Sequence, residues 1–184
     1  MASTPNVSPL APAAFPDLPV IDGVAFATAA AGVKYKGRTD VMLATLSAGT
    51  VVAGAFTRSS TRSASVLDCQ AKLGGASDGT AAIVVNSGNS NAFTGKNGVA
   101  SVEAITAATT RACGAPQERV FTSSTGVIGE PLPHERITAV LDTLAKSTSP
   151  AGIADAAKAI MTTDTFPKGA TASVEIDGKL VSIA

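Results

Sequence analysis

The stretch most suggestive of chemistry in this 184-residue chain is VFTSSTGVIGEP at residues 120–131. It passes from apolar side chains into hydroxyls and glycines, and it is expected to lead through Thr125 and Gly126 into a helix near Pro133. Glycine lets a reacting group approach the main chain, and backbone N–H groups in such a turn can stabilise an oxyanion or bind an anion. An ordinary strand-to-helix turn uses the same residue types and remains the simpler interpretation of these residues alone.

A nucleophile and a base to accompany this loop are hard to find. The only histidine, His134, falls at the start of a predicted helix, where an exposed structural role is favoured over a catalytic one. Cys69 has no histidine at the spacing typical of a cysteine-nucleophile family. Cys69 and Cys113 form no CxxC or Cys/His cluster, so we expect two reduced structural cysteines and no metal site.

Three further polar segments are candidates for binding. MTTDTFPKG (161–169) places Thr162, Thr163 and Asp164 just beyond a predicted helix, where they suit a ligand's ammonium group or simply turn the chain. NSGNSNAFTGKNG (86–98) lacks the spacing of a phosphate-binding loop and is expected to be a polar surface loop. KYKGRTD (34–40) is expected to be a solvated hairpin turn, with contact to an anionic ligand as the alternative.

The elements that must position these residues mix strands and helices. Helices are predicted at 98–112, at 137–144 with Pro133 in the first turn, and at 153–161 with Ser149 as N-cap and Pro150 at the first helical position. Asp177-Gly178 predicts a two-residue hairpin turn between 171–176 and 179–184. The other predicted strands are 24–32, 40–47, 50–57, 81–86 and 119–125.

Composition sets the class of the protein. With 45% hydrophobic and 15% charged residues, the chain reads as a globular α/β protein. Residues 1–20 carry five of the ten prolines and are expected to be an extended arm, and 21–184 a single domain. The formal net charge is zero, which disfavours a nucleic-acid surface. We see no signal peptide and no window long enough to cross a membrane, so a cytoplasmic location is expected.

Four segments in the same order resemble the ornithine acetyltransferases, also called bifunctional glutamate N-acetyltransferases, of arginine biosynthesis. The resemblance runs from about Lys36 to Ala184. It implies a precursor that cuts itself before an internal threonine, which becomes the N-terminal nucleophile of a β chain and is activated by its own amine. The segments are KGRTDVMLATLSAGTVVAGAFTRSSTRSASV, AIVVNSGNSNAFTG, VFTSSTGVIGEPLP and AAKAIMTTDTFPK.

The resemblance also implies roles and partners. Thr125 and Gly126 would form the oxyanion hole, and Thr162 would contact substrate, with Thr163 and Asp164 as weaker candidates. Acetyl would pass from N2-acetyl-L-ornithine to L-glutamate through an acetyl-threonine on the β chain. No bound cofactor is implied, although some members use acetyl-CoA as donor. The implied fold is α/β, with mixed sheets and outer helices, co-folded with the β chain in an α2β2 heterotetramer.

Two other classes of function remain open. A self-processed amidohydrolase could use the same oxyanion loop and release the acyl group to water, and a non-enzymatic binding module would need no nucleophile. The sequence stops at Ala184, before the lysine-containing segment that the resemblance leads us to expect. We therefore expect this chain to be inactive without its partner.

Overall fold

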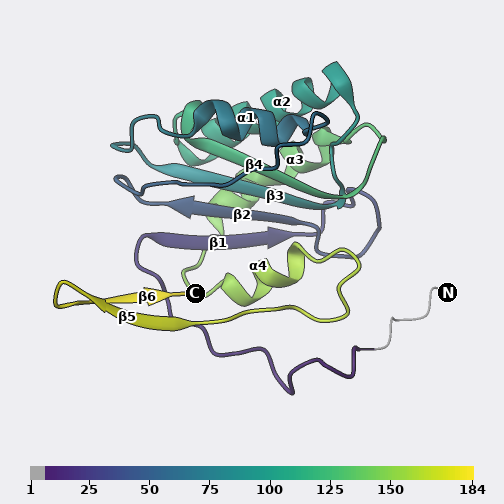
Figure 1. The fold of residues 1–184 in the computed structure, drawn as a ribbon. Helices are drawn as coiled ribbons and strands as arrows, with labels where there is room; N and C mark the ends of the chain where they lie inside the picture. The colour runs from purple at the N-terminus through teal and green to yellow at the C-terminus, as the bar shows by residue number, and fades with distance from the viewer. Residues whose placement is uncertain (1–6) are drawn as a thin grey trace.

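Residues 7–184 are described by the computed structural model of the protein, in which four strands form a mixed sheet (Figure 1). The strands are β1 (Val24–Ala29), β2 (Val41–Leu46), β3 (Ala81–Asn89) and β4 (Val120–Val127), in that spatial order. β1, β2 and β3 pair antiparallel, whereas β3 and β4 pair parallel. The α/β class with a mixed sheet and outer helices, as expected from the sequence, is confirmed.

Helices α2 (Gly95–Cys113) and α3 (His134–Lys146) cover one face of this sheet (Figure 1). α2 is the crossover between the parallel strands β3 and β4, and it ends at Gly114, whose φ of 72° is the left-handed conformation typical of a helix end. The short 3-10 helix η1 (Gln117–Arg119) then leads into β4. Apolar side chains from strands and helices meet in the core, among them Leu43, Val84, Ile105, Ile137 and Leu141.

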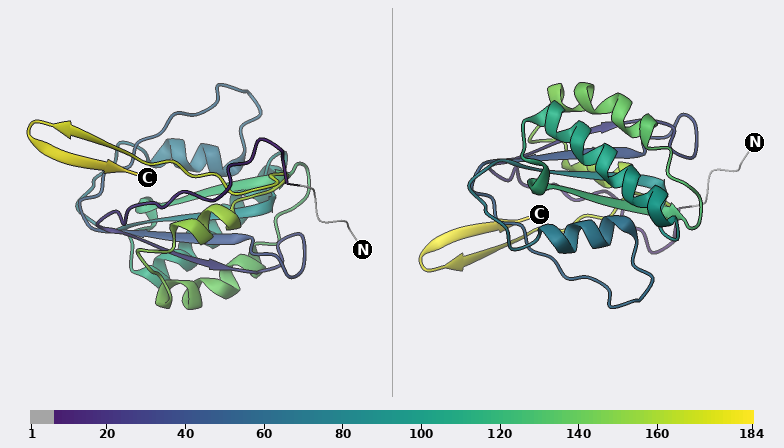
Figure 2. Two further views of the ribbon diagram at one scale, coloured as in Figure 1. Left: turned by 90° about the horizontal axis from the view of Figure 1, so that it is seen from below. Right: turned by 90° about the horizontal axis from the view of Figure 1, so that it is seen from above.

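Helix α1 (Ala64–Lys72) was not predicted, and it lies beside the outer edge of β4 on the side away from α3 (Figure 2). The Ser63 hydroxyl caps it by accepting from the Val66 N–H at 3.3 Å. Lys72 Nζ donates to the Val120 carbonyl at 2.9 Å and Cys69 Sγ to the Thr122 carbonyl at 3.3 Å. α1 thus occupies part of an edge that would otherwise expose unpaired backbone groups.

The strand predicted at 50–57 is wrong, because the structure forms neither strand nor helix there. Val51 is 77% exposed. A β-prone run becomes a strand only if a sheet edge is free to pair with it, and beside these residues α1 takes the edge of β4. Local sequence does not reveal that competition.

Helix α4 (Ile153–Ala159) packs beside β1, and its N-cap lies later in the chain than predicted. The Ser149 carbonyl and N–H exchange hydrogen bonds with Phe26 at 2.9 and 2.8 Å. Ser149 therefore extends the edge of the sheet and is not the N-cap, which is Gly152. A Cβ at Gly152 would lie 2.8 Å from the Phe26 carbonyl oxygen, so this close approach requires glycine.

The predicted hairpin is confirmed as β5 (Ala172–Ile176) and β6 (Lys179–Ile183), with a turn at Asp177-Gly178 where both residues have positive φ. All ten strand residues are exposed, and the hairpin projects from the body (yellow in Figure 1). Residues 7–23 form no helix or strand and reach the C-terminal part, where the Ser8 N–H donates to Thr165. The first six residues of the predicted arm lie outside the described part.

Within residues 7–184, no helix combines the length and the apolar character that crossing a lipid bilayer requires.

Candidate functional site

A cavity of about 380 Å³ brings together the segments that the sequence analysis singled out separately. Thr125 and Gly126 come from β4, whereas Thr162 and Thr163 follow α4. The main chain beneath them is contributed by the end of β3. The residues that line the cavity are Tyr35, Arg38, Gly88, Thr125, Gly126, Val127, Thr162 and Thr163.

The main chain of two facing glycines, Gly88 and Gly126, forms the floor of the cavity. Gly126 pairs with Gly88 across β3 and β4, and its φ is 136°. A Cβ on Gly126 would lie 2.3 Å from the Gly88 carbonyl carbon and 2.6 Å from the Asn89 nitrogen. Only glycine fits this contact. Thr125 and Gly126 thus lie inside a strand, and the expected strand-to-helix turn occurs only after Val127.

Buried asparagines hold the ends of β3 and β4 together. Ser124 Oγ donates to Asn86 Oδ1 at 2.7 Å, and Asn86 Nδ2 donates to the Asn89 carbonyl at 2.9 Å. Asn89 Nδ2 in turn lies 3.1 Å from the Glu130 carbonyl oxygen. Asn86 and Asn89 are each 2% exposed and Asn91 is fully buried. The surface loop predicted for 86–98 is therefore wrong in its first half, which is a buried scaffold beneath Thr125.

Asp164 shapes the segment that carries Thr162 and Thr163 but is not among the residues that line the cavity. Its carboxylate accepts from the ammonium of Lys168 and, at 3.2 Å, from the Thr162 N–H. The hydrogen bond from Lys168 and then that from Thr162 hold the pKa of Asp164 below its ordinary value. The ammonium that Asp164 binds in this structure thus belongs to the protein.

The connection between β1 and β2, expected to be a solvated turn, forms a wall of the cavity. The buried carboxylate of Asp40 organises it by accepting from the N–H groups of Ala31 at 2.7 Å and Val33 at 2.6 Å. Lys34 pairs with Glu130 at 2.6 Å. Tyr35 and Arg38 were not predicted as site residues, and only the concentration of polar residues in KYKGRTD hinted at their place.

The arrangement suits the binding of a polar ligand next to exposed main chain. Threonine hydroxyls, one phenol and one guanidinium surround it. None of the lining residues is a histidine, cysteine or carboxylate, so they supply no general base of the ordinary kind. His134 lies apart from them, with its Nδ1 3.0 Å from Ser101 Oγ. A reaction at a carbonyl in this cavity would need a general base that these lining residues do not supply.

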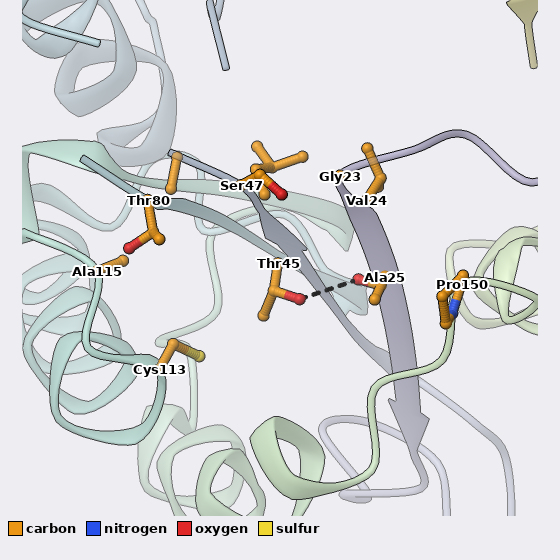
Figure 3. A pocket seen from close by; sticks show the side chains of 11 residues that line it. Gly23, Val24, Ala25, Thr45, Ser47, Thr80, Cys113, Ala115 and Pro150 are labelled. Atoms are coloured by element: carbon orange, nitrogen blue, oxygen red, sulfur yellow. Dashed lines mark hydrogen bonds between the residues drawn. The ribbon is translucent and has the colours of Figure 1, made fainter. Parts of the chain in front are cut away.

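A second cavity, of about 340 Å³, opens at the other end of the sheet (Figure 3). Thr45, Thr80 and Cys113 border it, and Thr45 Oγ1 donates to the Ala25 carbonyl at 3.4 Å. Burial raises the pKa of the Cys113 thiol and, on α1, that of Cys69. Both thiols therefore stay protonated near neutral pH, as suits structural cysteines.

Comparison with known proteins gives consistent matches. The family model described as the ArgJ family matches residues 25–184. The chain is 68% identical to the arginine biosynthesis bifunctional protein ArgJ of Ruegeria pomeroyi, over 100% of this chain and 45% of that protein. It is 52% identical to the protein of the same name from Bradyrhizobium diazoefficiens, over 97% and 43%. The chain thus spans less than half the length of these curated relatives.

Two solved structures are similar in fold. The arginine biosynthesis bifunctional protein argJ of Bacillus halodurans superposes with a TM-score of 0.78 at 29% identity, covering 88% of this chain and 84% of that one. The ornithine acetyltransferase of Mycobacterium tuberculosis, complexed with ornithine, gives 0.70 at 34% identity, covering 80% and 79%. These solved chains are similar in length to the present chain.

Proposed function

The chain belongs to the ArgJ family, and on that premise we propose that it is the α part of an acetyltransferase that moves acetyl from N2-acetyl-L-ornithine to L-glutamate. One observation carries the proposal. The candidate oxyanion residues Thr125 and Gly126 share a cavity with the candidate substrate residues Thr162 and Thr163. The same cavity offers no nucleophile–base pair of its own, which suits a reaction whose nucleophile lies in the remainder of the protein.

In the proposed mechanism, the N-terminal threonine of the β chain attacks the acetyl carbonyl. Its α-amine takes the hydroxyl proton, and the carbonyl oxygen becomes an oxyanion that Thr125 and Gly126 stabilise. Removing one such donor typically costs about 3 kcal/mol of transition-state stabilisation. Collapse of this tetrahedral intermediate breaks the amide bond, and the proton passes to the departing amine. Ornithine is released, and the threonine carries the acetyl group as an ester. The α-amine of glutamate then attacks this ester, forming N-acetylglutamate and restoring the threonine.

The partner is proposed on two further observations. The curated relatives are more than twice as long as this chain, whereas the solved chains are similar to it in length. This difference is what a precursor cut into two chains would produce. The hairpin β5–β6 also carries an uncovered apolar face, because its register places five apolar side chains on one side: Ala172, Val174, Ile176, Val181 and Ile183.

An isolated two-stranded hairpin is marginally stable in water, so we expect its apolar face to pack against another part of the assembled protein. We propose that the β chain provides it, in a cytoplasmic α2β2 assembly. This surface is separate from the cavity lined by Thr125 and Thr162, so assembly and substrate binding can be tested with different substitutions.

The test uses the protein from the full-length gene, incubated with N2-acetyl-L-ornithine with and without L-glutamate. Without glutamate we expect ornithine release to stop after about one equivalent per site, because the acyl-enzyme waits for an acceptor. With glutamate we expect continuous turnover to N-acetylglutamate. Continuous release without glutamate would instead show discharge to water, the behaviour of an amidohydrolase.

Thr162→Ala sharpens this assay. Loss of a hydroxyl that binds substrate should raise KM about tenfold, the effect of roughly 1.4 kcal/mol. The control is Thr138→Ala on α3, whose hydroxyl donates to the Glu135 carbonyl far from the cavity. Equal KM values for the two variants would show that the Thr162 hydroxyl does not bind substrate.

A further inference from the structure

Arg38 links two parts of the chain that are more than a hundred residues apart. Its Nη1 donates to the Thr162 carbonyl at 3.2 Å, and its Nη2 donates to the carbonyl of the preceding residue, Met161. A guanidinium presents its N–H groups in a rigid planar fork, which can hold two neighbouring carbonyls in fixed relation. These carbonyls follow the C-terminal end of α4, where free carbonyls accumulate and a positive charge is favourable.

The loop that carries Arg38 is itself firmly anchored. Asp40 ties its beginning through the Ala31 and Val33 N–H groups, and the Lys34–Glu130 ion pair joins it to the segment after β4. Lys34 also packs on Gly88, where an added Cβ would lie 2.8 Å from the Lys34 Cβ. The loop therefore bridges the two walls of the cavity, with β4 on one side and Thr162 on the other.

We infer that Arg38 is a positioning residue, whose guanidinium sets the place of Thr162 and Thr163 opposite Thr125 and Gly126. The inference rests on the proposed function for its kinetic consequences, but not for the structural link itself. Both terminal nitrogens of the guanidinium donate to backbone carbonyls, so Arg38 acts on the substrate through Thr162. In this structure the guanidinium donates within the protein, to the Met161 and Thr162 carbonyls.

The first experiment compares Arg38→Gln, Arg38→Lys and Arg136→Gln in the full-length protein. Arg38→Gln should raise KM for N2-acetyl-L-ornithine about tenfold or more with kcat changed far less, since misplacing a binding group by about 1 Å can cost up to roughly 10²-fold. Arg38→Lys keeps one donor and should recover part of the loss. Arg136 is the matched control, because it donates to the Gly32 carbonyl of the same loop away from the cavity.

A double-mutant cycle separates positioning from general weakening of the loop. If Arg38 acts largely through Thr162, Arg38→Gln should raise KM by a clearly smaller factor in the Thr162→Ala background than in the wild type. Additive effects of the two substitutions would overturn the inference. So would equal increases in KM for Arg38→Gln and Arg136→Gln, because both would then only loosen the loop. If Arg38→Gln fails to fold, Arg38→Lys takes its place in the cycle.

Amide hydrogen exchange tests the link without using activity. Arg38→Gln should speed exchange in residues 161–165 while leaving β3 and β4 as in the wild type. Unchanged exchange there would contradict the inference, whatever the kinetics show. If the wild type transfers no acetyl group but exchange responds as expected, the proposed function fails and the positioning role of Arg38 stands.

Discussion

At the scale of single residues, the structure constrains Gly126 tightly, because its φ is positive and an added Cβ would meet backbone atoms. Its sequence context drew attention to main chain that another group can approach closely, because glycine has no side chain. The sequence did not reveal that Gly126 faces Gly88 across two parallel strands, because that pairing depends on residues 38 positions apart. The need for glycine arises from this contact, in which a Cβ would meet backbone atoms that have no room to move.

Gly126→Ala should therefore destabilise the fold by more than about 3 kcal/mol, combining a backbone clash with an unfavourable φ. Gly129→Ala is the control. Gly129 also has a positive φ, of 83°, but nothing lies within 4 Å of an added Cβ, so the cost should be about 1 kcal/mol. Urea unfolding of both variants measures the difference. Similar losses would show that backbone strain alone, without the contact to Gly88, accounts for the glycine.

Asp164 gives a prediction for pH. Because its pKa is lowered on folding, its charged form stabilises the fold above the ordinary carboxyl pKa of about 3.9, and this contribution disappears as the pH falls through the lowered value. Lys168→Met removes the hydrogen bond that does most to lower the pKa of Asp164. NMR titration should then find the Asp164 pKa closer to its ordinary value. An unchanged pKa would mean that the Thr162 N–H, and not Lys168, is responsible.

At the scale of elements, the sequence predicted β1, β2, α2, α3 and the hairpin because each has a clear apolar period or turn signal. It failed where the partner of a segment is distant. The polar end of β3 looked like a surface loop, since nothing local shows that Asn86 accepts a hydrogen bond from Ser124 or that Asn89 donates one to the Glu130 carbonyl. The prediction of a strand at 50–57 failed for a related reason. Its residues favour a strand, but in the part of the chain that the structure describes no sheet edge is available for them to pair with.

The Asn86–Ser124 hydrogen bond should matter to both stability and catalysis. Ser124→Ala leaves the buried Asn86 Oδ1 without this donor, which should cost about 1–3 kcal/mol. Because Ser124 directly precedes Thr125, we expect kcat to fall more than KM rises. Ser123→Ala, an exposed neighbour on the same strand, is the control and should change neither quantity. Indistinguishable unfolding curves for the two variants would contradict the structural role of this hydrogen bond.

At the scale of the whole molecule, the uncovered face of β5–β6 leads to a prediction about assembly. Val181→Glu places a charge on the apolar face, whereas Ser182→Glu places one on the opposite, more polar face of the same strand. In the full-length protein, Val181→Glu should weaken the association of the two chains, measured by analytical ultracentrifugation, and Ser182→Glu should not. Unaltered assembly of Val181→Glu would mean that this face is not part of the interface.

The central claim is that this chain supplies the oxyanion and substrate residues while the rest of the protein supplies the nucleophile. The most direct measurement is the intact mass, under denaturing conditions, of the full-length protein after incubation with N2-acetyl-L-ornithine alone. We predict two chains, with one acetyl group added to the second chain, whose N-terminal residue is threonine, and none added to the chain described here. A single uncut chain, or an acetyl group on residues 1–184, would contradict the account.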